Sequence, residues 1–150
     1  MEKAQRSVVF IKPHVLNEHG LEKGREIFDY LDEKLAETGE FTVLAEKEVF
    51  FSVELSRQHY RAHLQKPFYP ELEQAVTQGK AMVLARAYEG PNIIARIRKV
   101  VGATDPAKAE EGTIRRKYAK SITFNAIHAS GDEKDAEWEI KLHFPELVEE

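Results

Sequence analysis

The pattern of hydrophobic and polar positions along the chain predicts strands that alternate with helices. Four segments are apolar and β-branched or alternate between apolar and polar, and are predicted strands: 7–11, 41–51, 81–85 and 122–127. Apolar residues at helical spacing, bounded by glycine, proline or capping residues, predict helices at 21–35, 53–64, 71–78, 91–101 and 132–142. Residues 102–120 show neither pattern and are expected to form a long loop, a feature that is usually functional in a compact domain.

The order of these elements predicts an α+β fold. With the auxiliary helices set aside, namely those between the second and third strands and the one after the last strand, the order is βαββαβ. That order indicates a four-stranded antiparallel sheet with helices packed on one face. No internal repeat, low-complexity segment or linker interrupts the chain, so we expect residues 1–150 to form a single domain.

Composition excludes several classes of protein. The chain has 150 residues, a hydrophobic fraction of 42% and no cysteine, so it can bury a core but holds neither a disulfide nor a thiolate metal site. The apolar run near the N-terminus is too short for a signal peptide and is interrupted by Pro13. No stretch approaches the length of a transmembrane helix. We expect a cytoplasmic protein with no membrane association.

The net charge of −4 argues against a specific nucleic-acid partner, but the charge is unevenly distributed. Residues 96–120 contain eight basic and three acidic residues, a local charge of +5 in an otherwise acidic chain. Such a run is commonly a solvated surface. It also suits a polyphosphate better than a long duplex.

His128 is the candidate nucleophile. It ends the last predicted strand, and Ser130, Gly131 and Asp132 behind it provide a hydroxyl, a sharp turn and a cap for the next helix. A neutral imidazole nitrogen attacks phosphorus readily. A carboxylate bonded to the other nitrogen would hold the ring and stabilise the charged product, and Glu139 on the following helix is the candidate for it.

Cations and glycines elsewhere in the chain favour an anion site. Lys12 ends the first buried strand, where a charge is costly unless it faces water or an anion. Gly102 begins the irregular stretch, and Gly112 and Arg115 lie within it. Glycine permits close backbone approach, and the arginine fork matches phosphate oxygens.

Six short motifs occur in order along nearly the whole chain. They are IKP at 11–13, HY at 59–60, PF at 67–68, GAT at 102–104, GTIR at 112–115 and NxxHxS at 125–130. Together they resemble the signature of nucleoside diphosphate kinases. The resemblance implies a ferredoxin-like fold and a ping-pong mechanism, in which a nucleoside triphosphate phosphorylates the histidine and a nucleoside diphosphate then accepts the phosphoryl group.

The same resemblance implies the cofactor and the partners. Mg²⁺ is expected on the nucleotide phosphates, with no protein side chain as a metal ligand. The substrates are expected to be nucleoside triphosphates and diphosphates, including ATP, GTP, GDP and deoxynucleotides, because stacking on one aromatic ring tolerates any base. Assembly as a homo-oligomer, a hexamer or a tetramer, is also expected.

Each matched position receives a role from the resemblance. His128 would carry the phosphate, Glu139 would be its partner and Ser130 would lie near that partner. The remaining matched residues would hold the nucleotide: Lys12 on the transferring phosphate and ribose, Asn125 on the ribose, Tyr60 beside the histidine, Phe68 on the base, and Arg98, Thr104 and Arg115 on the phosphates.

Several positions depart from the family pattern. Arg116 and Lys117 follow GTIR where glycine and aspartate are usual, and Gly131 is inserted before the aspartate of the histidine motif. The first strand ends in KPHV instead of KPDG, and the segment at 20–41 is longer than is typical. These differences leave the proposed catalytic residues intact and bear on subunit contacts and kinetic efficiency.

Two other functions fit parts of the pattern. A domain of this topology could hold nucleotide or single-stranded RNA without turnover, but RNA-binding relatives expose aromatics on central strands, where this chain has Val83 and Leu84. A regulatory or scaffolding paralogue would accommodate Arg116 and Lys117.

The other five histidines, at positions 14, 19, 59, 63 and 143, are expected to be structural or at the surface. His59 and His63 lie four residues apart on one predicted helix face, a spacing that also suits a metal pair, although a third ligand is missing.

Overall fold

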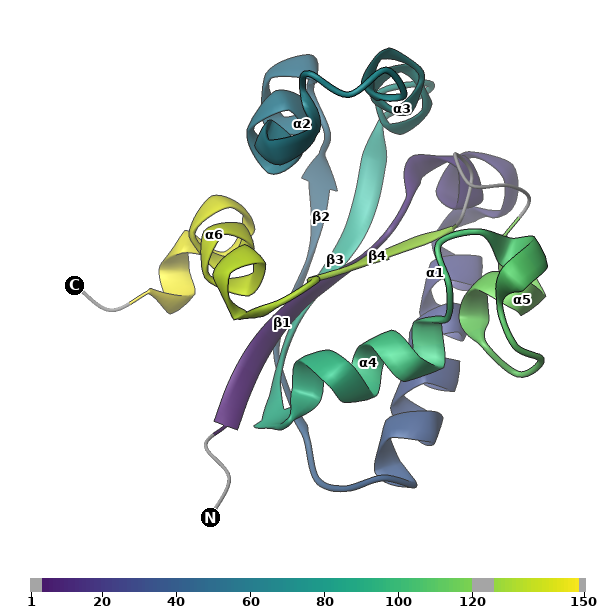
Figure 1. Ribbon diagram of the computed structural model, residues 1–150, viewed down its shortest axis with the longest axis vertical. Coiled ribbons are helices and arrows are strands. Elements are labelled where there is room, and N and C mark those ends of the chain that lie inside the picture. The colour runs from purple at the N-terminus through teal and green to yellow at the C-terminus, as the bar shows by residue number, and fades with distance from the viewer. Residues whose placement is uncertain (1–3, 120–125, 149–150) are drawn as a thin grey trace.

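The computed structural model describes residues 4–119 and 126–148. Within these ranges the strands are β1 (Ala4–Ile11), β2 (Thr42–Phe50), β3 (Met82–Pro91) and β4 (Ile127–Ala129). The α-helices are α1 (Pro13–Ala36), α2 (Val53–His59), α3 (Tyr69–Val76), α4 (Ile93–Val101), α5 (Ile114–Tyr118) and α6 (Glu133–His143) (Figure 1). Single 3₁₀ turns are η1 (Arg61–His63), η2 (Pro106–Lys108) and η3 (Pro145–Leu147).

The strands form one sheet in the order β2-β3-β1-β4, and each neighbouring pair is antiparallel. This arrangement confirms the α+β, ferredoxin-like fold expected from the sequence. Central strand β1 pairs Phe10 with Ala85 on one side and with His128 on the other. Residues 122–125 of the last predicted strand lie outside the described ranges. The described strand extends to Ala129, so His128 lies within β4.

Helices cover both faces of the sheet, so the prediction that they pack on one face was wrong. Alternation along β1 directs Val9 and Ile11 into a core with α1 and α4, as the βαββαβ pattern requires. Val8 and Phe10 point the other way, into a second core with α2, α3 and α6. The helices that the sequence interpretation set aside as auxiliary therefore cover the second face, the one on which the His128 ring stacks with Phe10 (Figure 1).

Capping residues place two of the helices. Ser52 Oγ accepts from the backbone N–H of Leu55 at 3.0 Å, and Asp132 Oδ1 accepts from that of Asp135 at 2.8 Å. The start predicted at Gly90-Pro91 was wrong, because these residues end β3 and α4 begins at Ile93.

The first helix is longer than the periodicity indicated. Pro13 occupies its first turn, where a missing N–H costs nothing, and Gly20, at φ 77°, interrupts the helical geometry before the periodic stretch begins. Among the described residues, no helix combines the length and apolarity needed to cross a membrane.

The segment 102–119 contains more structure than the predicted loop. Asp105 caps η2 and Thr113 caps α5 through side-chain oxygens that accept from backbone N–H groups. Gly102 has φ 92°, and a Cβ there would lie 2.7 Å from the side chain of Thr113. Glycine is therefore required at this position by backbone conformation and by close packing of the two ends of the segment.

Candidate active site

The imidazole of His128 lies where β1, β4, α2 and α6 meet. It stacks on Phe10 with ring centroids 4.7 Å apart, and its side chain retains 17% exposure. Its Nε2 is 2.8 Å from Oε1 of Glu139 on α6. Of the two neutral tautomers, a carboxylate at that distance favours the one protonated at Nε2, which leaves the lone pair on Nδ1. Nδ1 has no hydrogen-bond partner among the described residues.

Glu139 is itself held in place by Ser130. The carboxylate is 6% exposed, and the same Oε1 accepts from Ser130 Oγ at 2.7 Å. Ser130, which has no exposed surface, accepts in turn from the backbone N–H of Val8 on β1 at 2.9 Å. This chain of bonds ties the carboxylate to the central strand and orients the imidazole through it.

Two cations, a buried lysine and a partly buried arginine, lie at the same end of the sheet. Lys12 follows β1, and its backbone N–H donates to the carbonyl of Ala126, two residues before the histidine. Burial, and secondarily the charge of Arg115, lowers the pKa of Lys12 to about 7. Arg115 on α5 donates to the carbonyls of Gly102 and Ile127 at 3.0 and 2.8 Å.

Arg115 also has an N–H donor that no described residue accepts. Burial, followed by the charge of Arg98, lowers the pKa of Arg115 to about 10, and its Nε is buried without a partner among the described residues. Cations whose pKa values are lowered by burial and by a neighbouring positive charge, together with an N–H donor that has no partner among the described residues, are the arrangement that a bound anion would relieve.

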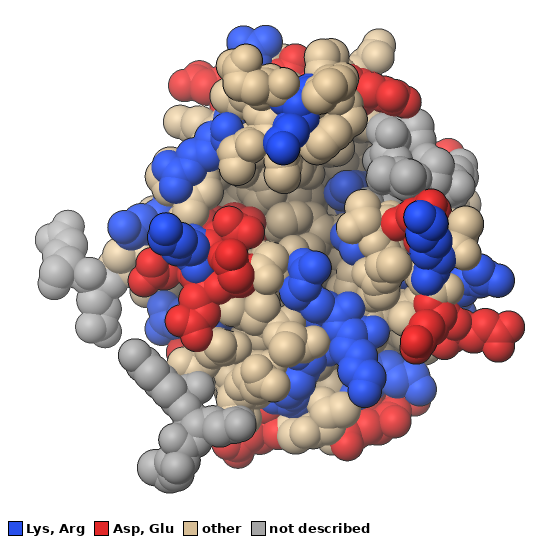
Figure 2. Space-filling view, viewed as in Figure 1, with Lys and Arg blue, Asp and Glu red and all other residues tan. Residues whose placement is uncertain are grey.

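Arg98 and Thr104 are more exposed. Arg98 lies in the last turn of α4, and a Cβ added to Gly131 would come within 3.9 Å of its Nη1, so it reaches the turn between β4 and α6. Thr104 follows α4 as an exposed residue. Figure 2 shows a hollow beneath the α2 and α3 region, with acidic side chains on the α6 side and basic side chains toward α4 and α5.

The two aromatic candidates differ in burial. Tyr60, at the end of α2, is 7% exposed, and its hydroxyl is buried without a partner among the described residues. Burial and then the charge of Glu139 raise its pKa, so the phenol lies near the carboxylate that holds His128. Phe68 is 51% exposed, with its ring centroid 5.6 Å from that of His63. Asn125 falls outside the described residues.

The structure thus gathers most of the residues selected from the sequence. Six lie together and are wholly or largely buried: His128, Glu139, Ser130, Lys12, Arg115 and Tyr60. Arg98, Thr104 and Phe68 are exposed, which is where a soluble ligand would meet them.

Two histidines expected to be structural or at the surface lie in the site. The His59 ring meets the His128 ring edge to face, with centroids 4.5 Å apart, and its Nδ1 is 2.8 Å from Nε2 of His143. Burial, aided by the charge of His128, lowers the pKa of His59 well below its usual value and that of His143 to about 4. Both rings are therefore neutral at pH 7.

The suggested metal pair of His59 and His63 is not formed. His63 is exposed, whereas His59 is buried and bonded to His143. In the sequence, the HY motif at 59–60 was the feature that could have indicated a place for His59 in the site. Nothing in the sequence marked His143, which lies 84 positions away.

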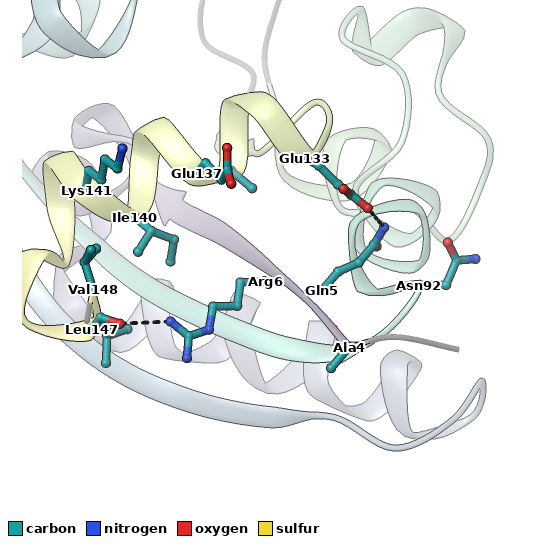
Figure 3. Close-up of a pocket in the computed structure, with 11 residues that line it drawn as sticks. Ala4, Gln5, Arg6, Asn92, Glu133, Glu137, Ile140, Lys141, Leu147 and Val148 are labelled. Carbon is teal, nitrogen blue, oxygen red and sulfur yellow. Dashed lines mark hydrogen bonds between the residues drawn. The ribbon is translucent and has the colours of Figure 1, made fainter. Parts of the chain in front are cut away.

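A cavity of about 790 Å³ lies elsewhere, between the start of β1 and the outer side of α6. Gln5 bonds to Glu133 across it at 2.7 Å, and Arg6 donates to the carbonyl of Leu147 at 3.0 Å (Figure 3). None of the gathered site residues lines this cavity. We therefore place the candidate active site at His128.

Comparison with known proteins points the same way as the geometry. The model of the family described as nucleoside diphosphate kinase matches residues 5–148. A nucleoside diphosphate kinase of Symbiobacterium thermophilum is 38% identical over 143 residues, covering 95% of this chain and 89% of the relative. One from Thermus thermophilus is 39% identical over 142 residues, covering 93% and 95%. The crystal structure of the Encephalitozoon cuniculi enzyme has a TM-score of 0.81 at 31% identity, covering 100% of this chain and 93% of that one.

Proposed function

Because this chain belongs to the nucleoside diphosphate kinase family, we propose that it transfers the γ-phosphoryl group of a nucleoside triphosphate to a nucleoside diphosphate through a phosphohistidine at His128. The observation that carries the proposal is the bond between His128 Nε2 and Glu139, which leaves Nδ1 as the free nucleophile. Ser130 supports it by orienting the carboxylate.

The reaction has two half-steps. In the first, the Nδ1 lone pair attacks the γ-phosphorus, the P–N bond forms, and the bond from phosphorus to the β,γ-bridging oxygen breaks as the nucleoside diphosphate leaves. In the second, a terminal β-phosphate oxygen of another nucleoside diphosphate attacks the same phosphorus and the P–N bond breaks. The Nε2 proton stays on the ring throughout, and Glu139 stabilises the positive charge that develops there.

The cations supply the electrostatic part of catalysis. We assign the phosphates to Lys12, Arg98, Arg115 and Thr104, because transfer of a phosphoryl group needs mainly positioning and charge stabilisation. The buried Nε of Arg115, which has no partner within residues 4–119 and 126–148, supports this assignment.

Mg²⁺ fits this site as an ion bound by the phosphate oxygens of the nucleotide. The side chains assigned to the phosphates are donors, and Glu139 is engaged with His128 and Ser130, so the phosphate oxygens would hold the ion. When bound there, Mg²⁺ would neutralise part of the phosphate charge.

Nucleoside recognition falls to residues around the phosphate site. Phe68 offers an exposed ring on which any base can stack, which supports broad base specificity. Tyr60, whose ring centroid lies 4.6 Å from that of His59, is assigned a place beside the reactive histidine. Asn125, which lies outside the described residues, is assigned to the ribose. By analogy with the family we also propose a homo-oligomer, a hexamer or a tetramer, acting in the cytoplasm.

The test is phosphoryl transfer in two separate steps. Purified protein is incubated with γ-labelled ATP and Mg²⁺, freed of nucleotide, and examined for acid-labile, base-stable label. We expect label on the wild type and on His63→Ala, none on His128→Ala, and transfer of the label to added GDP. Protein that binds nucleotide but never takes label would instead be a regulatory or scaffolding paralogue.

A further inference from the structure

A set of potential metal ligands is assembled around the reactive histidine. One ring nitrogen of His59, one of His128 and a carboxylate oxygen of Glu139 lie within 4.8 Å of one another. Two imidazoles and a carboxylate, with a further position left open, are a donor set that binds Zn²⁺ in many proteins. Nitrogen donors also favour Co²⁺, Ni²⁺ and Cu²⁺ over Mg²⁺, which prefers oxygen.

Partners already orient two of these three ligands. His143 bonds to Nδ1 of His59, which leaves Nε2 of that ring for a ligand, and Ser130 donates to Glu139. Metal-binding histidines usually have their second nitrogen engaged in this way. The hydrogen bond between the two imidazoles can run in either direction. In both cases the buried Nδ1 of His143 has no partner among the described residues, so neither direction is strongly favoured. When Nδ1 of His59 is the donor, Nε2 of His59 carries a lone pair that can bind a metal.

The distances and charges permit an ion after small movements. Ligands at about 2.0–2.1 Å from a tetrahedral zinc lie roughly 3.3 Å apart, so the 2.8 Å contact between His128 and Glu139 must open and His59 must approach. Glu139 and the nearby Asp135 supply negative charge on the α6 side, which offsets the positive charge of Lys12 near His59. The exposed 17% of the His128 side chain provides a path to solvent.

We propose that His59, His128 and Glu139 bind a divalent transition-metal ion of the zinc class, and that this ion blocks phosphorylation of the histidine. The ion would displace the proton from Nε2 of His128 to Nδ1, where it occupies the lone pair that attacks phosphorus, and would also take the carboxylate that otherwise stabilises the ring. The inhibitory consequence rests on the proposed function, whereas the binding site does not. His143 acts here through His59 and is a positioning residue.

The first test is spectroscopic and needs no activity. Metal-stripped protein is titrated with Co²⁺, and the visible bands of a four-coordinate complex are recorded, followed by displacement with Zn²⁺. We expect one Co²⁺ per chain, loss of the bands in His59→Gln, and retention in the matched surface variant His63→Gln. His143→Phe should weaken binding by about 10- to 100-fold, as loss of a ligand-orienting partner does elsewhere.

Circular dichroism of each variant separates loss of the site from loss of the fold. Absence of four-coordinate Co²⁺ bands in the folded wild type would overturn the proposal, as would bands unchanged in folded His59→Gln. Millimolar Mg²⁺ should not displace the Co²⁺.

The second test measures the rate of histidine labelling for each variant with and without Zn²⁺. The rate with Zn²⁺ is divided by the metal-free rate of the same variant. The ratio should fall strongly for the wild type and stay near one for His59→Gln. Labelling without Co²⁺ binding would refute the metal site alone, and Co²⁺ binding without labelling would refute the proposed kinase alone.

Discussion

Ser130 and Glu139 are joined by a 2.7 Å hydrogen bond between a serine hydroxyl and a carboxylate, both buried, beside the imidazole of His128. The serine also accepts a hydrogen bond from the backbone N–H of Val8 on the central strand, and the glutamate also contacts Nε2 of His128. Because the carboxylate has donors from both directions, its position depends on β1 and on α6 together.

Glu139→Gln should slow histidine labelling by about 10- to 100-fold. A hydrogen bond to a charged group contributes roughly 1.5–3 kcal/mol, and each 1.4 kcal/mol corresponds to about tenfold in rate. Rapid-quench labelling measures the effect. Glu137→Gln, the same change at an exposed position of α6, is the control and should match the wild type. Equal rates in the two variants would show that the carboxylate does not assist.

Ser130→Ala should lower the free energy of unfolding by about 1–3 kcal/mol, because the buried N–H of Val8 and the carboxylate both lose a partner. Urea denaturation measures it. Ser7→Ala is a matched control, since this hydroxyl is equally buried but has no partner among the described residues. Its removal should leave stability unchanged or raise it. A larger loss of unfolding free energy in Ser7→Ala than in Ser130→Ala would contradict the stabilising role of the Ser130 hydrogen bonds.

Nucleotide binding should take up a proton at Lys12. Burial lowers the pKa of the free side chain to about 7, and a bound polyphosphate would raise it by favouring the charged form. Affinity for ADP should therefore fall as the pH rises above 7, with uptake approaching about one proton per site near pH 8. Calorimetry in buffers of different ionisation enthalpy measures this uptake.

Two variants identify the group that takes up the proton. Lys12→Arg keeps its charge over this pH range and should abolish most of the uptake. Lys134→Arg, at an exposed position, should leave the uptake unchanged. Uptake that persists in Lys12→Arg would assign the proton to another group.

Phe68→Ala should weaken nucleotide binding by a similar factor for purines and pyrimidines. Stacking of a base on an aromatic ring contributes about 1–3 kcal/mol and is tolerant of base identity. The ring is half exposed, so the stability of the fold should change little. Phe50→Ala, which removes a ring that is 61% exposed on β2, should not alter the affinity. A loss confined to one base would instead indicate base-specific recognition.

Local chemistry made much of this protein predictable. The apolar runs of β1 and β3 identify buried strands, and Ser52 and Asp132 cap helices through contacts only three residues long. The contact between His128 and Glu139 was also predictable, because a short stretch of chain joins β4 to α6. Errors occurred where local patterns compete: Gly90 and Pro91 suggest a helix start, but pairing of β3 with β1 keeps them in the strand.

The amino-acid sequence by itself determined which residue types were available, the alternation that gives β1 two buried faces, and the order of elements that places His128 beside β1. The tertiary structure decided which distant side chains share that site. His59 and His143 are separated by 84 positions, and only the packing of α2 and α6 on the same face of the sheet brings their rings together. Tertiary structure likewise set the lowered pKa of Lys12, because it depends on burial and on the charge of Arg115, which is distant in the sequence.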